Sequence, residues 1–137
     1  TVSLMSLSHL GFQPGYFRTV LMLGNNFGLP GSYDGIVDLL QDLHGLTSKN
    51  AVILAQSRDP EATDEPAHHH YHEMNRARGQ ATGFVRFHIK YKGEISDWID
   101  LLLCSPEEMR SLAKQAGWSL KRMFGEPNLY IGLLEKM

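Results

Sequence analysis

Short apolar runs, separated by turns and by amphipathic segments, make up most of the sequence. Residues 2–7 form one such run, which predicts a short strand. After a break rich in glycine and proline, residues 16–23 end in four consecutive apolar residues. This pattern is typical of a strand that is buried on both faces of a parallel sheet. Residues 51–55 form a second run of the same kind.

The segment between these two runs has the pattern of an amphipathic helix. Ser32 stands where an N-cap residue is expected, and Ile36, Leu40 and Leu43 recur at spacings of i, i+4 and i+7. Gly45 is expected to lie just past the last turn of this helix. A strand, a helix and a strand in this order predict two parallel strands joined by a right-handed crossover.

The chain becomes polar between residues 57 and 82, and a helix is expected at about residues 67–77 after a proline. Residues 85–92 then alternate strictly between apolar and polar side chains, which predicts a strand. Together with residues 95–103 this strand is expected to form a hairpin.

The C-terminal part begins with a strong helix signal. Ser105 is a candidate N-cap, Pro106 occupies the first helical position, and Glu108 completes a capping box. Two further strands are expected at residues 118–124 and 129–134, separated by a Gly-Glu-Pro-Asn turn.

Composition places the chain among globular domains. It has 137 residues, about one domain, and 42% of them are hydrophobic. The formal net charge of -2 argues against a general attraction to nucleic acid or to an anionic membrane, and no apolar run is long enough to span a bilayer. Cys104 is the single cysteine, so no internal disulfide can form and a reducing, cytoplasmic setting is expected. Because it follows three leucines, Cys104 is expected to be buried and inert.

The turn at residues 24–28 is the first candidate site. It follows a buried strand and precedes a helix, which places it at the carboxyl edge of the sheet, where open α/β sheets bind ligands. Asn25 and Asn26 carry amides that can both donate and accept hydrogen bonds. A tight structural connection with capping asparagines is the alternative interpretation, and residue chemistry does not separate the two. The spacing does not match a dinucleotide-binding or phosphate-binding glycine loop.

A histidine cluster at residues 68–72 is the second candidate. On a helix, His68 and His72 share a face, as do His69 and Glu73. Two ligands on one face can recruit zinc, but the sequence nearby offers no third strong ligand. Solvated histidines, with no metal, are therefore the favoured interpretation.

A basic face on the expected hairpin is the third candidate. Arg86, His88 and the lysines at 90 and 92 lie on one side of the strand. They can hold an anionic ligand, or they can pair with Asp97 and Asp100 of the partner strand. A charge-paired, solvated face is favoured, because aromatic residues do not interleave with the basic ones.

The order of these elements resembles class I S-adenosylmethionine-dependent methyltransferases. Residues 20–29 read V-L-M-L-G-N-N-F-G-L, and residues 51–60 read A-V-I-L-A-Q-S-R-D-P. With the helix between them, they are similar to the fourth strand, fourth helix and fifth strand of that family. Residues 105–137 resemble the family's last helix and its final antiparallel strand pair. Residues 57–104 resemble the insertion, with extra strands, that many small-molecule methyltransferases carry.

The resemblance implies an α/β fold within one partial domain over residues 1–137. Its sheet would be a partial Rossmann-like methyltransferase sheet, mostly parallel, with an antiparallel C-terminal strand pair and an inserted β-hairpin. The family's strand order is three, two, one, four, five, seven, six. Residues 2–7 align best with the third strand, so the chain is expected to begin about halfway through the fold and to lack the glycine-rich cofactor loop.

The same resemblance implies S-adenosyl-L-methionine as cofactor. It places Ser6 and Leu7 near the adenine of the cofactor. It places the turn near the methionine part and the transferred methyl group, with four candidate residues, Gly24, Asn25, Asn26 and Phe27. Because the glycine loop is missing, this chain alone is expected to bind the cofactor weakly or not at all and to be inactive. No catalytic residue is assigned.

The parent protein is therefore expected to transfer a methyl group to a small molecule. The insertion offers four candidate residues for the acceptor side, namely Tyr71, Asn75, Arg78 and Arg86. Two alternatives remain, a non-catalytic half-domain that serves as a binding or assembly module, and a metal-responsive protein that uses the cluster from His68 to His72. Residues 20–23 would form an open sheet edge, which residues 2–7 of the same chain or the edge of a second copy can pair with. We favour the second copy, and therefore expect a homodimer, unless the missing N-terminal half covers this edge.

Overall fold

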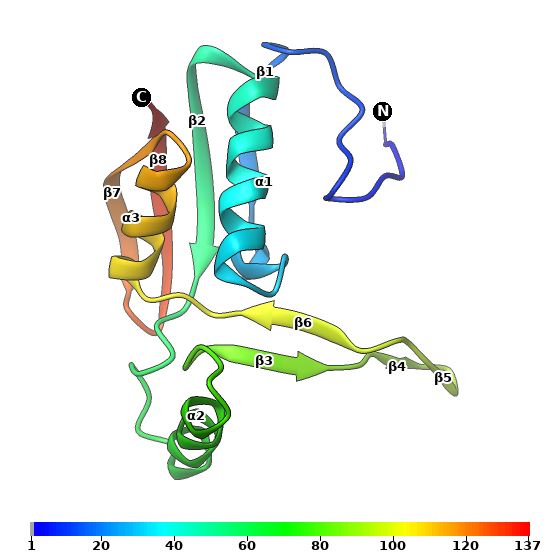
Figure 1. The fold of residues 1–137 in the computed structure, drawn as a ribbon, viewed down its shortest axis with the longest axis vertical. Helices are drawn as coiled ribbons and strands as arrows, with labels where there is room; N and C mark the ends of the chain where they lie inside the picture. Colours follow the sequence, from blue (N-terminus) through cyan, green and yellow to red (C-terminus); the bar gives the residue numbers. More distant parts are fainter. Residues whose placement is uncertain (1) are drawn as a thin grey trace.

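The computed structural model describes residues 2–137 and has a four-stranded sheet at its centre (Figure 1). The strand order is β1-β2-β8-β7. β1 (Phe17–Met22) runs parallel to β2 (Thr47–Ser57), whereas β8 (Leu129–Lys136) is antiparallel to both β2 and β7 (Trp118–Glu126). This is the order that the methyltransferase resemblance implies for its fourth, fifth, seventh and sixth strands.

Helix α1 (Tyr33–Leu46) forms the crossover between the two parallel strands. It begins as the sequence predicts, because the side chain of Ser32 accepts a hydrogen bond from the backbone N–H of Gly35 at 3.1 Å. The expected stop at Gly45 is wrong, and the helix continues for one more residue. Thr47 provides the cap instead, since both its backbone N–H and its hydroxyl donate to the carbonyl of Leu43.

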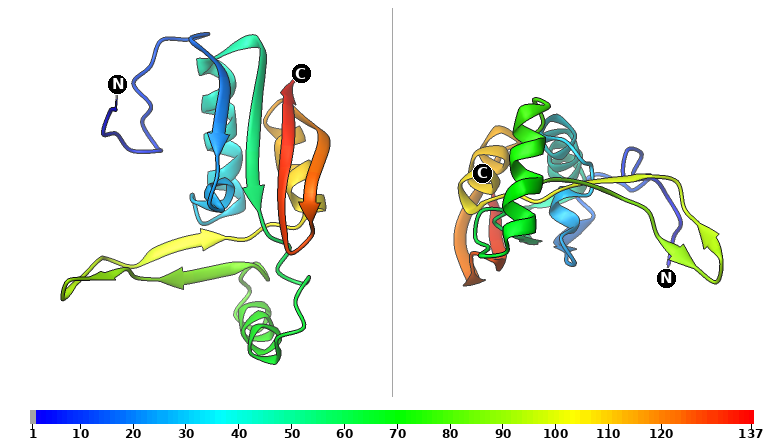
Figure 2. Two further views of the ribbon diagram at one scale, coloured as in Figure 1. Left: turned by 180° about the vertical axis from the view of Figure 1, so that it is seen from behind. Right: turned by 90° about the horizontal axis from the view of Figure 1, so that it is seen from below.

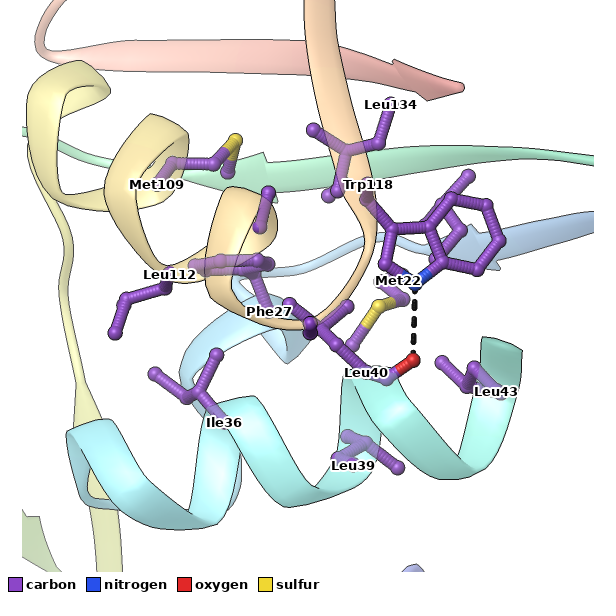
Figure 3. Packing of buried hydrophobic residues seen from close by; sticks show 14 of the residues in the cluster. Met22, Phe27, Ile36, Leu39, Leu40, Leu43, Met109, Leu112, Trp118 and Leu134 are labelled. Carbon is purple, nitrogen blue, oxygen red and sulfur yellow. Dashed lines mark hydrogen bonds between the residues drawn. The ribbon is translucent and has the colours of Figure 1, made fainter. Parts of the chain in front are cut away.

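One face of the sheet is covered by α1 and α3 (Pro106–Gln115), and the core lies between them and the strands (Figure 3). The capping box predicted at the start of α3 is present, with Ser105 and Glu108 bonded reciprocally. Trp118 is fully buried, and its indole Nε1–H donates to the carbonyl of Leu40 at 2.9 Å. This hydrogen bond joins β7 to the middle of α1.

The other face of the sheet is not covered by any described residue of the chain (Figure 2). The strand register places one apolar row across it, in which Leu21, Leu54 and Leu133 stand side by side. The prediction that β1 is buried on both faces is therefore wrong, because Leu21 is 61% exposed. The strand lies at the edge of the sheet, where it has one neighbouring strand and one helix-covered face. We call this uncovered side the open sheet face.

The strand predicted at residues 2–7 is also wrong, since the structure has no strand there. These residues leave the sheet and do not pair with β1, and the Val2 side chain is 99% exposed (Figure 1). A strand needs a neighbouring strand to satisfy its backbone groups, and an apolar run supplies no such neighbour by itself. The third-strand alignment of this segment is not supported by its structure.

Below the sheet lie helix α2 (Pro66–Ala77) and an antiparallel ladder (Figure 1). In this ladder β3 (Phe84–Phe87) pairs with β6 (Ile99–Leu102), and further out β4 (Lys90–Tyr91) pairs with β5 (Glu94–Ile95).

The continuous strand expected over residues 85–92 is interrupted after Phe87. At the break, the hydroxyl of Ser96 accepts a hydrogen bond from the backbone N–H of Ile89 at 2.9 Å, so a side chain takes a role that a strand partner would otherwise fill. None of the helices in residues 2–137 has the length and apolar character needed to cross a membrane.

Candidate functional site

The turn that follows β1 lies at the carboxyl end of the two parallel strands. Gly24 and Asn25 both have left-handed backbone conformations, with φ of 69° and 65°. The turn is tied to the neighbouring strand, because the backbone N–H of Gly24 donates to the side-chain oxygen of Gln56 near the end of β2 at 2.7 Å. The short helix η1 (Asn26–Gly28) follows, and the fully buried ring of Phe27 anchors it in the core.

Asn25 has a side-chain oxygen that its surroundings do not satisfy. The atom Oδ1 is buried and accepts no hydrogen bond from any described residue. A buried acceptor without a donor costs about 1–3 kcal/mol, and a non-glycine residue at positive φ adds to this cost. Asn26, the next residue, is exposed. The two asparagines therefore differ, and only Asn25 carries a cost that the fold itself does not explain.

The position of the turn is fixed from below by β6. Gly28 packs so closely on this strand that a Cβ at its position would overlap the carbonyl group of Leu102. Glycine is required here by the close approach of two backbones rather than by φ, which is not positive at this residue. The antiparallel ladder therefore crosses the carboxyl edge of the sheet directly beneath the turn.

The loop that follows β2 forms a second feature at the same edge. Together with α2, β3 and the turn between β7 and β8 it lines an open cavity of about 720 Å³. Polar residues of the loop and of α2 make up most of the lining, and Val85 and Leu103 provide apolar wall. The loop is held in place at both ends. The backbone N–H of Asp59 donates to the carbonyl of Pro127 at 2.9 Å, and Thr63 Oγ1 shares a hydrogen bond with His68 Nδ1 at 2.9 Å.

His72 is the buried titratable side chain of this cavity, with 8% of its surface exposed. Burial lowers the pKa of its imidazole, and the positive charge of Arg76 and the neighbouring His68 and His69 lower it further. Glu61 acts in the opposite direction, but its carboxylate is paired with Arg76 at 3.2 Å. The ring of His72 is therefore neutral near pH 7.

Other buried polar groups near this edge of the sheet form hydrogen bonds within the fold. The hydroxyl of Ser57 accepts from the backbone N–H of Cys104 at 2.9 Å, and the hydroxyl of Tyr130 donates to the Cys104 carbonyl at 2.8 Å. Burial raises the pKa of the Cys104 thiol and of the Tyr130 phenol well above their ordinary values. Cys104 is buried, as the sequence predicts. Its hydrogen bonds with Ser57 and Tyr130 connect the segment before α3 to the last residue of β2 and to β8.

The structure separates the residues that the sequence analysis grouped as a cofactor site. Leu7 and Asn26 lie together in the lining of an apolar cavity of about 330 Å³ beside β1 and α1. Ser6 lines a neighbouring cavity against α1, and its hydroxyl is 2.8 Å from that of Ser8. Gly24, Asn25 and Phe27 belong to the turn and face the edge of the sheet or the core.

The four acceptor candidates of the insertion are also spread out. Tyr71 lines the 720 Å³ cavity. Asn75 is buried, and its side-chain amide donates to the carbonyls of Thr82 and Phe84 at 3.0 and 2.7 Å. Arg78 is exposed at the end of α2, and Arg86 forms a two-point ion pair with Asp100 at 2.6 and 2.8 Å.

This ion pair bears on the basic face of the ladder. It agrees with the favoured charge-paired interpretation, and hydrogen bonding to Arg86 lowers the pKa of the Asp100 carboxyl. Asp97 forms no ion pair among residues 2–137.

The histidine cluster lies on α2, as predicted. Within the described part of the chain, however, no three His, Cys, Asp or Glu side chains are arranged to hold a metal ion.

Sequence reasoning considered His72 only as a metal ligand and missed its place in a cavity. A usable signal was present, because the polar loop from Arg58 follows directly on a buried parallel strand, where ligands bind in α/β folds. What the sequence did not reveal was that α2 folds back over that loop.

No protein-family model matches the sequence, and a search of curated proteins found no match. Solved structures do match it. A S-adenosylmethionine-dependent methyltransferase from Bacteroides fragilis, crystallised with S-adenosyl-L-homocysteine, is 21% identical with a TM-score of 0.72, and the match covers 95% of this chain and 52% of that one.

Two further structures have the same arrangement at lower identity. A S-adenosylmethionine-dependent methyltransferase from Methanosarcina mazei is 10% identical with a TM-score of 0.74, covering 97% of this chain and 65% of that one. The CcbJ methyltransferase from Streptomyces caelestis is 12% identical with a TM-score of 0.67, covering 97% and 62%. The chain therefore has the mixed α/β fold of these methyltransferases and spans 52–65% of their lengths.

Proposed function

We propose that this chain is part of a S-adenosylmethionine-dependent methyltransferase that acts on a small molecule. The fold supports this proposal, because its structural neighbours are S-adenosylmethionine-dependent methyltransferases and one of them is crystallised with S-adenosyl-L-homocysteine. The observation that carries the proposal is the buried, unpaired Oδ1 of Asn25 at the carboxyl edge of the parallel strands. An acceptor kept without a donor at a ligand-binding edge is explained by a ligand that brings the donor.

The residues of the turn suit the methionine part of this cofactor. Its ammonium group is a strong donor, and the Oδ1 of Asn25 is an acceptor that lacks one. Gly24 leaves space beside the backbone, since nothing lies within 4 Å of a Cβ at its position. When bound, the cofactor would supply a methyl group activated on a sulfonium sulfur. The chain's contribution is then to position two reactants, which needs no catalytic triad.

Binding by this chain alone is expected to be weak. It spans 52–65% of the matched structures, so the rest of such a fold would add further cofactor contacts. A suitable test is an NMR titration of the ¹⁵N-labelled chain with S-adenosyl-L-homocysteine, with adenosine as the matched control. We expect the signals of residues 24–27 to shift with the first ligand and much less with the second. Unchanged signals at millimolar ligand would contradict the proposal.

Assembly with a second copy of this chain is a second candidate function, and the open sheet face favours it. Leu21, Leu54 and Leu133 form an apolar row there, and β1 presents an unpaired backbone edge beside it. A second copy carries both features, so that edge-to-edge pairing of two β1 strands would join the two rows into one surface. Sedimentation equilibrium over a range of concentrations tests this proposal.

A further inference from the structure

We propose that Gln56 is a positioning residue for the proposed cofactor site. Its side-chain oxygen binds the turn after β1 and holds Asn25 in the conformation that keeps its Oδ1 buried and without a donor. This role rests on the proposed methyltransferase function, because the ligand assigned to the turn is the cofactor.

The turn is not held in shape by its own hydrogen bond alone. Gly24 and Asn25 are its central residues, and both have positive φ, as in a type I′ turn. The bond that closes it runs from the Asn26 backbone N–H to the Leu23 carbonyl and is 3.4 Å long, beyond the usual range for this kind of bond. Asparagine tolerates the left-handed region better than most residues, but it does not prefer it as glycine does. A second contact is therefore needed to keep Asn25 in this conformation.

Gln56 provides that contact from the neighbouring strand. The paired residues of β1 and β2 end with Met22 and Ala55, so the backbone of β2 offers no partner to Gly24. Instead, Gln56 Oε1 accepts a hydrogen bond from the Gly24 backbone N–H at 2.7 Å. The backbone of Gln56 is itself fixed in the sheet, since it pairs with Ile131 of β8.

No other side chain among residues 2–137 forms a hydrogen bond with residues 24–28, so this bond is the turn's single side-chain link to the sheet.

The other end of the turn is held by packing. Phe27 is fully buried, and Gly28 lies directly against the backbone of Leu102. Only Asn25 and Asn26 stand between this packed end and the link at Gly24. With both ends fixed, the amide oxygen of Asn25 stays buried. Without the link at Gly24, the backbone of Asn25 can leave the left-handed region and its amide can turn to solvent.

This loss of order has a direct effect on ligand binding. When only a fraction of the molecules has the binding-competent turn, the apparent Kd rises by the inverse of that fraction. We expect a rise of about fivefold when the acceptor of Gln56 is removed. A fivefold change corresponds to about 1 kcal/mol, which is typical of one net hydrogen bond.

Three variants separate the acceptor from the bulk of the side chain. Gln56→Met keeps the length of the side chain and removes its oxygen, whereas Gln56→Glu keeps an oxygen that can accept from Gly24. Gln115→Met is the matched control. It also removes a glutamine hydrogen bond, from Nε2 to the Ser111 carbonyl at 3.4 Å, but this bond lies within α3.

The first measurement is amide hydrogen exchange of Gly24 without ligand. We expect exchange to be about fivefold faster in Gln56→Met and to stay within about twofold of the wild type in Gln56→Glu and Gln115→Met. The NMR signal of the Trp118 indole N–H, which is bonded to the Leu40 carbonyl, reports in each variant that the core is intact. Unchanged exchange of Gly24 in Gln56→Met would overturn the proposal.

The second measurement is the NMR titration of residues 24–27 with S-adenosyl-L-homocysteine. Gln56→Met should bind about fivefold more weakly than the wild type, and Gln56→Glu should recover the affinity to within about twofold. A purely structural role for Gln56 would change the exchange of Gly24 and leave the affinity as it is. A Gln56→Met variant that binds as well as the wild type, or a Gln56→Glu variant that binds as weakly as Gln56→Met, would therefore refute the positioning role.

The wild type distinguishes this proposal from the proposed function. A wild type that responds to the ligand, together with equal affinity in Gln56→Met, refutes the role of Gln56 alone. A wild type that does not respond at millimolar ligand refutes the proposed function, and fast exchange of Gly24 in Gln56→Met would then still show that Gln56 holds the turn.

Discussion

Replacing Asn25 by glycine is expected to make the protein more stable, although the change removes a side chain from a half-buried position. The reason is that Asn25 carries two costs in the folded state. Its φ of 65° lies in the left-handed region, and its Oδ1 is buried without a donor. Glycine adopts this backbone conformation freely and has no side-chain oxygen to leave unpaired.

The size of the effect follows from these two contributions. Removing the unpaired acceptor returns about 1–3 kcal/mol, and relief of positive φ adds about 1 kcal/mol, less for asparagine than for other residues. The greater entropy of glycine in the unfolded chain offsets about 0.5–1 kcal/mol. The net expectation for Asn25→Gly is an increase of about 1–3 kcal/mol in the free energy of unfolding, or a rise in Tm of about 3–10 °C for a domain of this size.

Thermal and urea unfolding followed by circular dichroism provide the assay. Asn26→Gly is the matched control, because Asn26 is exposed and its φ is not positive, so that glycine there should be neutral or destabilising by up to about 1 kcal/mol. The same Asn25→Gly variant should lose the NMR response of residues 24–27 to S-adenosyl-L-homocysteine. If Asn25→Gly destabilises the protein more than Asn26→Gly does, Asn25 supports the fold, and its assignment to a ligand is wrong.

Three further predictions concern the sheet and its packing. Gly28→Ala should destabilise the protein by about 3 kcal/mol in urea unfolding, because a Cβ there overlaps the carbonyl of Leu102 and neither backbone can move aside. Trp118→Phe should cost about 2 kcal/mol in the same assay, since it removes the buried hydrogen bond to Leu40 and part of the ring volume. In sedimentation equilibrium the wild type should dimerise as its concentration rises, and Leu21→Lys should not, because Leu21 is exposed on the open sheet face. A wild type that stays monomeric at high micromolar concentration rules out the dimer.

The parts of the fold that could be predicted from the sequence are those set by local interactions. The N-cap of α1 and the capping box of α3 involve residues three apart, so the sequence alone contains both partners of each hydrogen bond. The strand–helix–strand unit was predictable for a related reason, because its apolar periodicity changes from strand to helix and back within 40 residues. The final strand pair joined by a Gly-Glu-Pro-Asn turn is equally local.

The wrong predictions concern segments whose structure depends on contacts with residues that are distant in the sequence, or on contacts that do not form. Residues 2–7 have a strand-like composition, but they do not pair with any described strand, although β1 has a free edge. Leu21 has the sequence environment of a buried residue and is exposed, because its burial depends on what covers the sheet rather than on its neighbours in sequence. The strand over residues 85–92 is interrupted after Phe87, where Ile89 bonds to the side chain and backbone of Ser96 on the returning chain.

The candidate site shows the same division between local and distant information. That a polar turn follows β1 was predictable, and the sequence named Asn25 and Asn26 together without distinguishing them. Their difference arises from η1 and the core, which bury one amide oxygen and leave the other residue exposed. For His72 the helix was predictable, but its burial depends on the loop after β2 folding against α2.

The hydrogen bonds of the buried polar side chains separate structural residues from candidate functional ones. Asn75 and Ser57 are as polar as Asn25, and each of them bonds to a backbone group of another segment, Asn75 to the start of β3 and Ser57 to Cys104 before α3. Replacing such a residue removes a link that the fold needs. The amide oxygen of Asn25 has no such link among the described residues, and it lies in the turn directly after β1. Because the fold gains nothing from leaving this oxygen unpaired, a ligand at that edge is the physical reason that best accounts for it.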